Sequence, residues 1–242
     1  IIFNHANLMG IKTIGYQHSF INPKTSLFID KSTFNPKKIL TSGELTKKIF
    51  INKFKIENKY LKNFGSSKFQ NTSDNFKLKN NLTKTILILP EGVIDEVHFM
   101  LNFVSSFINK YTDFNFILRL HPLTSLKNIN TSKVLNLKNF LISNNSLEDD
   151  LNNSTHVLFR GSAAIIEAVN KNLIPIYLAN TDELNLNHSF PKDIFIPKVN
   201  NIEDLKDLLD KKYNKDDINI FNNIKNFTKS YFDKYNFSSL IE

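Results

Sequence analysis

The sequence predicts an α/β protein in which two α/β/α domains face a cleft, and two observations support this prediction. Short apolar segments rich in β-branched residues alternate with segments of helical periodicity, a pattern typical of βαβ units with parallel sheets. Residues 70–84 are polar and rich in Asn, Lys, Ser and Thr, which indicates a linker between two such runs. We expect an incomplete first domain over 1–69, a second domain over 85–215 and a closing helical segment over 216–242.

The first domain is expected to contain three short strands and one helix. The strands are residues 11–16, 38–41 and 61–64. A glycine lies inside the first strand and within two residues after the end of each of the other two. Between the last two strands, residues 44–56 carry apolar side chains at helical spacing. These side chains are Leu45, Ile49, Phe50 and Phe54.

The second domain continues the same alternation with five expected strands. They are residues 85–89, 114–120, 140–142, 156–159 and 173–178. The segment 95–111 is an amphipathic helix, because its apolar residues form one stripe. Further helices are expected from Ser146, from Gly161 to Ala168, and over 204–211 and 218–235.

Composition excludes several classes of protein. The chain has no Cys, which excludes a disulfide framework, a thiolate zinc site and a cysteine nucleophile. No apolar run approaches the roughly 20 residues that span a bilayer. The first residues lack both Met and the charged start of a signal peptide. We therefore expect a cytoplasmic protein whose chain begins inside a longer polypeptide.

The formal net charge of +8 has two interpretations. Most of the lysines fit solvated helix surfaces, whereas a part of the charge suits a nucleotide, a phosphate or an anionic inner leaflet. The second interpretation predicts weak peripheral association with the inner membrane. Nucleic acid is not expected as a partner, since no basic stripe is interleaved with aromatic residues.

Polar and glycine residues follow four of the expected strands, at the positions where ligands bind open parallel sheets. The four segments are 16–19, 90–92, 119–122 and 160–162. In the last of these, Gly161 permits a tight turn and the Ser162 hydroxyl can cap the next helix. The free N–H groups of that helix would bind a phosphate, and Glu167 would reach ribose hydroxyls. The alternative is an ordinary strand–helix junction.

His121 and Pro122 follow the second strand of the second domain. Pro122 fixes the backbone of the residue before it, and a His held there can donate to a phosphate oxygen. The alternative is a half-buried His bonded to a neighbouring backbone group. Arg119 alternates with apolar neighbours, so it can also face a polar layer.

Two residues are candidates for the general base. A neutral His18 at the end of a first-domain strand could take a proton from a hydroxyl. Glu91 is the second candidate base or a contact to the ligand, although a carboxylate there also complements the dipole of the helix that follows. His98 and His156 lie on a helix and at a strand start, where structural roles are expected.

Several motifs are missing from the sequence. No HExxH or paired-carboxylate arrangement supports a metal site. The absence of GxxxxGK[ST] and GxGxxG argues against P-loop NTPases and dinucleotide dehydrogenases, and the absence of GxSxG leaves serine hydrolases without support.

The strand-end segments together resemble the GT-B surface-polysaccharide transferases of bacteria, including sialyltransferase-like and Kdo-transferase-like enzymes. They are also similar to the CDP-glycerol glycerophosphotransferases. The resemblance extends from Gly10 to about Asp182. It is carried by residues 10–18, 119–122, 161–164 with Glu167, and 173–178.

The resemblance implies a GT-B fold of two Rossmann-like domains, the first on the acceptor side and the second binding the nucleotide donor. It places His121 with Pro122, and Ser162, at the donor phosphate. It makes His18 a base or acceptor-site residue. We include Arg119, Arg160, Gly161, Ala163 and Glu167 in the donor site. Donors of these groups are CMP- or CDP-linked, and neither a metal nor another cofactor is implied.

The predicted function is therefore transfer of a sugar, an acidic one activated by CMP, to a hydroxyl of a glycan or lipid-linked glycan acceptor. Three alternatives stay open. The first is transfer of glycerol or ribitol phosphate from a CDP donor. The second is a UDP-sugar 2-epimerase-like reaction, and the third is a non-catalytic nucleotide-sugar-binding protein.

Overall fold

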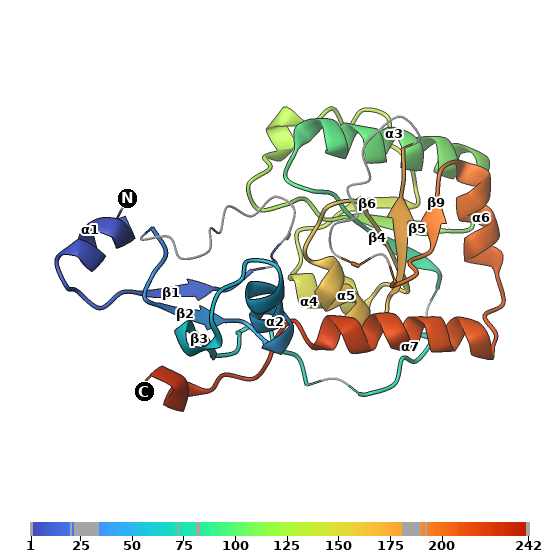
Figure 1. The fold of residues 1–242 in the computed structure, drawn as a ribbon. Helices are drawn as coiled ribbons and strands as arrows, with labels where there is room; N and C mark the ends of the chain where they lie inside the picture. The colour runs from blue at the N-terminus through green and yellow to red at the C-terminus, as the bar shows by residue number, and fades with distance from the viewer. Residues whose placement is uncertain are drawn as a thin grey trace. The chain divides into compact units, whose positions relative to one another are not determined.

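The structure, a computed structural model, divides the chain into two compact units that are described separately (Figure 1). Unit 1 contains residues 1–71 and 226–242, and unit 2 contains residues 72–225. The residues that the structure describes are 2–19, 21, 34–71, 73–80, 83–180, 190–191 and 193–240. Asp182, where the resemblance ends, lies outside them.

Unit 1 is built on a three-stranded parallel sheet of order β1-β2-β3. The strands are β1 (Ile14–Gln17), β2 (Lys38–Thr41) and β3 (Leu61–Asn63), and the helices are α1 (Ile2–Leu8), α2 (Glu44–Asn52) and the short η1 (Asn58–Tyr60). Helix α2 packs on the sheet through Phe50, which is fully buried against Ile39 and Leu61. The apolar spacing that predicted this helix therefore corresponds to its buried face.

The C-terminal segment completes unit 1. Helix α7 (Lys215–Lys229) ends six residues before the expected boundary at 235. Beyond it, Asp233 N–H donates to Ser42 O and Asp233 O accepts from Ser66 N–H, each at 2.9 Å. The Asp233 carboxylate accepts from Glu44 N–H at 3.0 Å, which satisfies a free N–H at the start of α2. These bonds to unit 1 replace the intrahelical bonds that would continue α7.

Gly65 lets this C-terminal segment approach closely. Its φ of +91° lies in the left-handed region, which favours glycine. A Cβ atom at this position would lie 2.6 Å from the carbonyl carbon of Lys234. Both the backbone conformation and the close approach therefore require glycine at position 65.

Unit 2 contains a six-stranded parallel sheet of order β6-β5-β4-β7-β8-β9. Counted along the unit, this order is 3-2-1-4-5-6, the order of a Rossmann sheet. The strands are β4 (Thr85–Leu89), β5 (Asn115–Leu118), β6 (Phe140–Ile142), β7 (His156–Phe159), β8 (Ile174–Leu178) and β9 (Lys198–Val199). The fold class is thus α/β with Rossmann-like units, as predicted.

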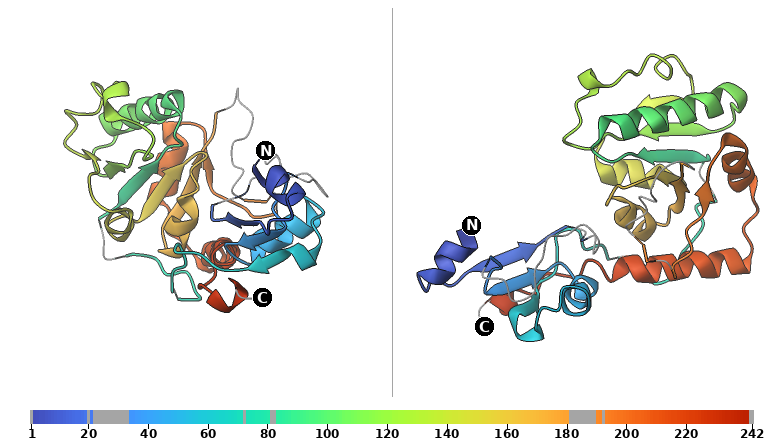
Figure 2. Two further views of the ribbon diagram at one scale, coloured as in Figure 1. Left: turned by 90° about the vertical axis from the view of Figure 1, so that its left-hand side faces the viewer. Right: turned by 45° about the horizontal axis from the view of Figure 1, so that its top comes forward.

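Helices cover both faces of this sheet (Figures 1 and 2). One face carries α3 (Ile94–Lys110) and α6 (Ile202–Asp210), whose buried side chains share a core with alternate residues of the strands. The other face carries α4 (Leu147–Asn152), α5 (Ile165–Asn170) and α7. All five residues of β4 are buried, as expected for a central parallel strand covered on both sides.

Part of the expected linker belongs to unit 2. Phe76 is buried against Phe221 of α7, with ring centroids 5.0 Å apart, and its N–H donates to Asn222 at 2.7 Å. The buried Lys225 ammonium donates to Asn75 O at 3.3 Å and to Asn172 Oδ1 at 2.6 Å. The boundaries therefore fall at 71/72 and 225/226, and differ from the expected 70–84 and 216–242, because these long-range contacts are not visible in local composition.

Most of the predicted strands are confirmed. Four of them keep the predicted bounds, 38–41, 85–89, 140–142 and 156–159. The predicted strand 114–120 is shorter in the structure, and α5 begins four residues later than expected. Helix α1 and the two-residue strand β9 were not predicted.

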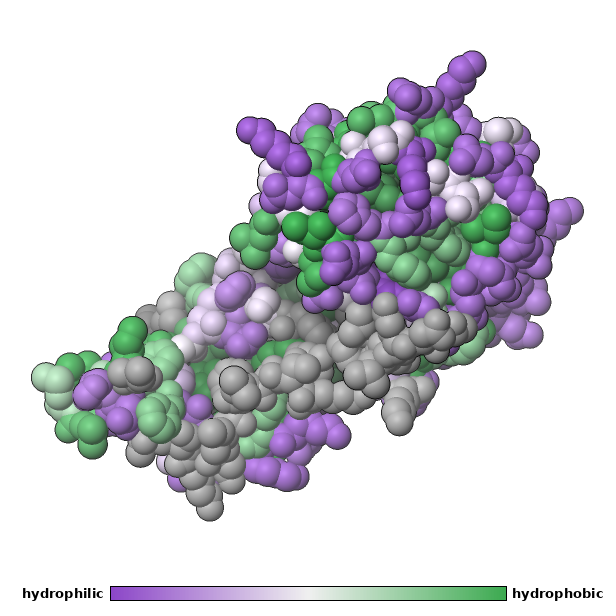
Figure 3. Space-filling model, turned by 90° about the horizontal axis from the view of Figure 1, so that it is seen from above, coloured by the Kyte–Doolittle hydropathy of each residue, from purple (hydrophilic) through white to green (hydrophobic). Residues whose placement is uncertain are grey.

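Exposed apolar side chains gather at the N-terminal end of unit 1, where Figure 3 shows hydrophobic surface. They include Ile2, 82% exposed, and Leu8 and Met9, each 75% exposed. Helix α1 has no buried residue. Within the described part of the chain, no helix has both the length and the apolar character needed to cross a membrane.

The buried His156 makes the stability of the fold depend on pH. Burial, assisted by the charge of Lys84, lowers its pKa from 6.5 to about 3. Between these two values the unfolded chain binds a proton that the folded chain does not, so stability falls as the pH decreases below about 6.5. Between pH 8 and pH 5 this group should cost about 2 kcal/mol of unfolding free energy.

Replacing His156 by Gln should remove this contribution, because Gln does not titrate. Urea unfolding at pH 8 and pH 5 measures it as the difference between the two proteins in their loss of stability. An equal loss in both proteins would show that His156 is not buried in its neutral form.

Candidate functional site

The strand order of unit 2 places the candidate site. In a doubly wound sheet the strand order reverses between the first and fourth strands, which here are β4 and β7. Ligands bind beyond the carboxyl ends of the strands at this switch point. Glu91 and Gly92 follow β4, and Gly161 and Ser162 follow β7. The fold therefore brings three of the four predicted strand-end segments to one edge, since residues 119–122 follow β5, the neighbour of β4.

Glu91 and Gly161 are in direct contact across the switch point. A Cβ atom on Gly161 would lie 2.8 Å from the Glu91 carboxyl carbon and nearer still to Oε2. The carboxylate thus occupies the space that any larger residue at 161 would fill. Within the described residues, the Glu91 carboxylate has no hydrogen bond or ion pair. It is half-buried and available as a proton acceptor.

His121 lies over the backbone of the same loop. A Cβ atom on Gly92 would be 3.1 Å from His121 Nδ1 and 3.4 Å from Cγ. Thr124 Oγ1 donates to Gly92 O at 3.2 Å, and Thr124 N–H donates to His121 O at 2.8 Å. The loop after β5 is thus bonded to the loop after β4, which positions the His121 ring against Gly92, the residue that follows Glu91.

The hydrogen bonds of His121 indicate its tautomer. Nδ1 accepts from Leu123 N–H at 3.2 Å, so in the neutral ring the proton is on Nε2. The half-buried ring therefore offers an N–H donor at Nε2. Pro122 is exposed beside it, and the prediction that Pro122 ends the strand is wrong, because β5 ends at Leu118.

Arg160 points into the protein. Its side chain is 1% exposed and its Nε forms an ion pair with Glu96 of α3. Nη1 donates to Leu178 O at 3.1 Å, and the guanidinium lies 4.7 Å from the centroid of the Phe99 ring. The positive charge of Arg160 is thus paired with groups of the chain itself. This placement gives Arg160 a structural role, whereas the sequence suggested a contact to the donor.

Arg119 is held in a similar way. Its Nη1 donates to Asp150 Oδ2 and to Asn145 O, each at 2.8 Å. Asp150, fully buried on α4, also accepts from Ser143 Oγ at 2.7 Å. This network corresponds to the polar layer that was the alternative interpretation of Arg119. Neither Glu96 nor Asp150 was identified from the sequence, which carries no local signal for these partners.

The prediction that Ser162 caps the following helix is wrong. Helix α5 has Ala164 as its N-cap residue, without a side-chain hydrogen bond. Ser162 O instead accepts from Ile165 N–H at 3.4 Å, so a tight turn through Ala163 precedes the helix and delays its start. Ser162 is 8% exposed at the strand end. Glu167 is half-buried within α5, which has only six residues.

His18 belongs to unit 1 and follows β1. Its exposed ring lies 6.1 Å from the centroid of Tyr16. Tyr16 Oη donates to Gly65 O at 2.7 Å, and burial raises the pKa of Tyr16. Tyr16 is therefore a neutral neighbour at neutral pH, and the His18 imidazole is accessible from solvent.

Chemically, the edge of unit 2 offers a carboxylate that can accept a proton, a ring N–H that can donate to an oxyanion, and a glycine without a side chain between strand and helix. This combination suits a ligand with a phosphate and a reacting hydroxyl. In the described part of the chain, no three His, Asp or Glu side chains are grouped so that they could hold a metal ion.

Comparison of the structure with solved structures shows GT-B-like relatives. The wall teichoic acid polymerase TagF matches with a TM-score of 0.53 at 14% identity, over 81% of this chain and 53% of that chain. S. aureus MnaA in complex with UDP matches with a TM-score of 0.59 at 11% identity, over 95% and 66%. A Listeria monocytogenes protein provisionally assigned as a UDP-N-acetylglucosamine 2-epimerase matches with a TM-score of 0.51 at 15% identity, over 82% and 56%.

These likenesses show the fold, which is GT-B-like and consists of Rossmann-like α/β/α units. The chain spans between about half and two thirds of the length of these three structures. No family model and no curated protein matches the sequence.

The contact between Glu91 and Gly161 can be tested by stability. Gly161→Ala should lower the unfolding free energy by about 1–3 kcal/mol, because the new methyl group overlaps the Glu91 carboxylate and displaces it. Urea unfolding measures this loss in the full chain.

The control is the same substitution in a Glu91→Ala background. There the methyl group meets no carboxylate, so the loss should largely disappear. An equal loss in both backgrounds would contradict the contact.

Proposed function

We propose that this chain is a GT-B-type glycosyltransferase that moves a sugar from a nucleotide-activated donor to a hydroxyl of a glycan or lipid-linked glycan. The finer prediction is a CMP-activated acidic sugar, and it rests on the sequence resemblance. The observation that carries the proposal is the unengaged Glu91 carboxylate against Gly161, with His121 against the neighbouring Gly92, at the switch point of a Rossmann sheet. Weak peripheral attachment to the inner membrane is part of the proposal and rests on the +8 charge.

In the proposed reaction, an acceptor hydroxyl attacks the anomeric carbon of the donor. The new C–O bond forms while the bond from that carbon to the phosphate oxygen breaks. Glu91 or His18 takes the hydroxyl proton. His121 Nε2–H and the backbone around Gly161 and Ser162 stabilise the negative charge on the departing nucleotide. No step uses Arg119 or Arg160, whose charges are bound to Asp150 and Glu96.

A second candidate is transfer of a polyol phosphate from a CDP donor. It is favoured by the likeness to TagF, including a TagF variant soaked with CDPG that matches with a TM-score of 0.51 at 14% identity. The same groups would act, but the attacked atom would be phosphorus and the leaving group would be CMP. The likeness to MnaA with UDP and to the Listeria protein supports a third candidate, a UDP-sugar epimerase-like reaction that consumes donor without an acceptor.

Nucleotide binding is the first test. We expect CMP or CDP to raise the melting temperature more than UMP, UDP, GDP or ADP do. A ligand at 100 times its dissociation constant stabilises the native state by about 2.7 kcal/mol. His121→Ala and Ser162→Ala should lose this stabilisation, because each removes a predicted contact to the phosphate.

The control for this panel is His98→Ala. His98 lies on α3 in the same unit, and its Nε2 accepts from Asn130 N–H at 3.0 Å, so its removal should leave nucleotide stabilisation intact. If UDP alone stabilises the protein, the epimerase-like reaction becomes the better proposal. If no nucleotide does, the phosphate site at the switch point is wrong.

Turnover tests the base. With Glu91→Gln we expect kcat to fall by about 10²–10⁴-fold, as for loss of a general base, while the melting-temperature shift with CMP is retained. Release of CMP from CMP-sugars and from CDP-polyols, each with and without acceptor, measures the rate and separates the candidates. Full turnover in Glu91→Gln together with loss in His18→Ala would assign the base to His18.

A further inference from the structure

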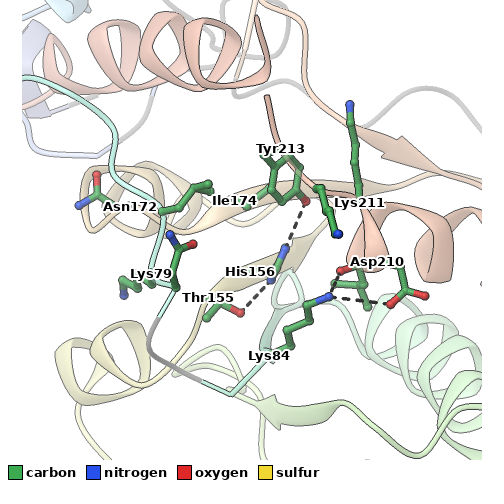
Figure 4. Close-up of a pocket in the computed structure, with 13 residues that line it drawn as sticks. Lys79, Lys84, Thr155, His156, Asn172, Ile174, Asp210, Lys211 and Tyr213 are labelled. Carbon is green, nitrogen blue, oxygen red and sulfur yellow. Dashed lines mark hydrogen bonds and ion pairs between the residues drawn. The ribbon is translucent and has the colours of Figure 1, made fainter. Parts of the chain in front are cut away.

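A cavity of about 440 Å³ opens at the opposite edge of the unit 2 sheet (Figure 4). It lies at the amino ends of β4, β7 and β8, and it is also lined by residues 78–80 and by the segment 209–213 after α6. Every lining residue belongs to unit 2. The predicted donor site lies at the carboxyl ends of the same strands, so this cavity is a separate feature. Its volume is in the range of small-molecule sites.

The charge of the lining is strongly positive. Four lysines and one carboxylate, Asp210, face the cavity. Lys84 neutralises the end of α6, because its ammonium donates to Leu209 O at 2.5 Å and lies 3.8 Å from Asp210. Lys211 forms an ion pair with Asp217 at 2.6 Å. The charges of Lys84 and Lys211 are therefore compensated by groups of the chain itself.

The other two lysines, Lys79 and Lys212, have no carboxylate within ion-pair distance in the described part of the chain. Lys79 is half-buried and donates to Leu151 O at 2.7 Å and to Ser154 O at 3.0 Å. Burial, with the charge of Lys171, lowers its pKa to about 8. Lys212 is exposed at the rim. The cavity therefore holds uncompensated positive charge.

Neutral polar groups line the inner part of the cavity. The buried His156 ring is bonded on one side to Thr155 Oγ1 at 2.8 Å and on the other to Tyr213 Oη at 3.4 Å (Figure 4). Tyr213 Oη also donates to Leu208 O at 3.1 Å. Burial lowers the pKa of His156 and raises that of Tyr213, so both are uncharged at neutral pH. Perturbed titratable groups that converge in one cavity are typical of ligand sites.

We propose that this cavity is a second ligand site of the nucleotide-binding unit, and that it binds a small phosphate-bearing molecule through Lys79 and Lys212, with His156 and Tyr213 on its inner wall. A phosphate supplies the negative charge that the lysines lack and accepts several N–H bonds. The remaining volume, next to Ile174 and Leu209, accommodates an apolar or ring-containing part of the ligand. This inference is independent of the donor, the acceptor and the reaction proposed above.

Calorimetric titration of the full chain with inorganic pyrophosphate tests the site. Pyrophosphate should bind saturably, and Lys212→Gln should weaken binding about tenfold, as expected for loss of one charge-assisted contact. Lys110→Gln is the matched control. Lys110 carries the same charge in the same unit, but it pairs with Glu203 at 2.6 Å on the surface, and its loss should change the affinity less than twofold.

Pyrophosphate could instead bind at the switch point, so His121→Ala is titrated in parallel and should leave the affinity unchanged. Lysine modification with acetic anhydride, mapped by mass spectrometry, adds a readout that does not depend on mutation. Pyrophosphate should protect Lys79 and Lys212 but not Lys110. Equal weakening by Lys212→Gln and Lys110→Gln, loss of binding in His121→Ala alone, or absence of protection at Lys79 would each overturn the proposal.

Discussion

The ion pair between Arg160 and Glu96 is the interaction on which the candidate site depends. Arg160 is the first residue after β7, and its buried guanidinium joins that strand end to the first turn of α3 and to Leu178 O at the end of β8. These are the elements that frame Glu91 and Gly161. A buried charge that lost its partner would be strongly destabilising, so the pair fixes the relative positions of the loops after β4 and β7. It also leaves Glu91, rather than Arg160, as the charged group available to a ligand.

The Asp233 segment has a corresponding role in unit 1. Within the described residues, the sheet of this unit has three strands, and the N–H groups at the start of α2 have no cap from Gly43. Asp233 provides that cap from 189 residues away and also accepts from Asn63 Nδ2 at 2.5 Å. The C-terminal segment is therefore part of the first unit. A chain cut before residue 226 would leave these polar groups, and the close approach at Gly65, without their partners.

The carboxyl ends and the amino ends of the unit 2 strands differ in the charge and in the kinds of side chain that they present. At the carboxyl ends, an unengaged carboxylate and an imidazole lie among glycine-containing loops, an arrangement that suits proton transfer and a departing phosphate. At the amino ends, lysines surround uncharged His156 and Tyr213, an arrangement that suits binding of an anion without chemistry. Since the same strands β4 and β7 form both edges, a ligand at one edge is about one strand length away from the other.

The sequence alone determined the α/β class, the positions of five of the six strands in unit 2 and the strand-end segments that hold Glu91, His121 and Gly161, because apolar periodicity and glycines after strands are local signals. Only the tertiary structure decided which side chains near those segments are bound to partners within the chain itself. It bound Arg119 to Asp150 and Arg160 to Glu96, it delayed the start of α5 beyond Ser162, and it assigned the C-terminal segment to unit 1. The two ion pairs and the placement of the C-terminal segment depend on partners 31 to 189 residues apart in the chain, and no local pattern of residues records such distances.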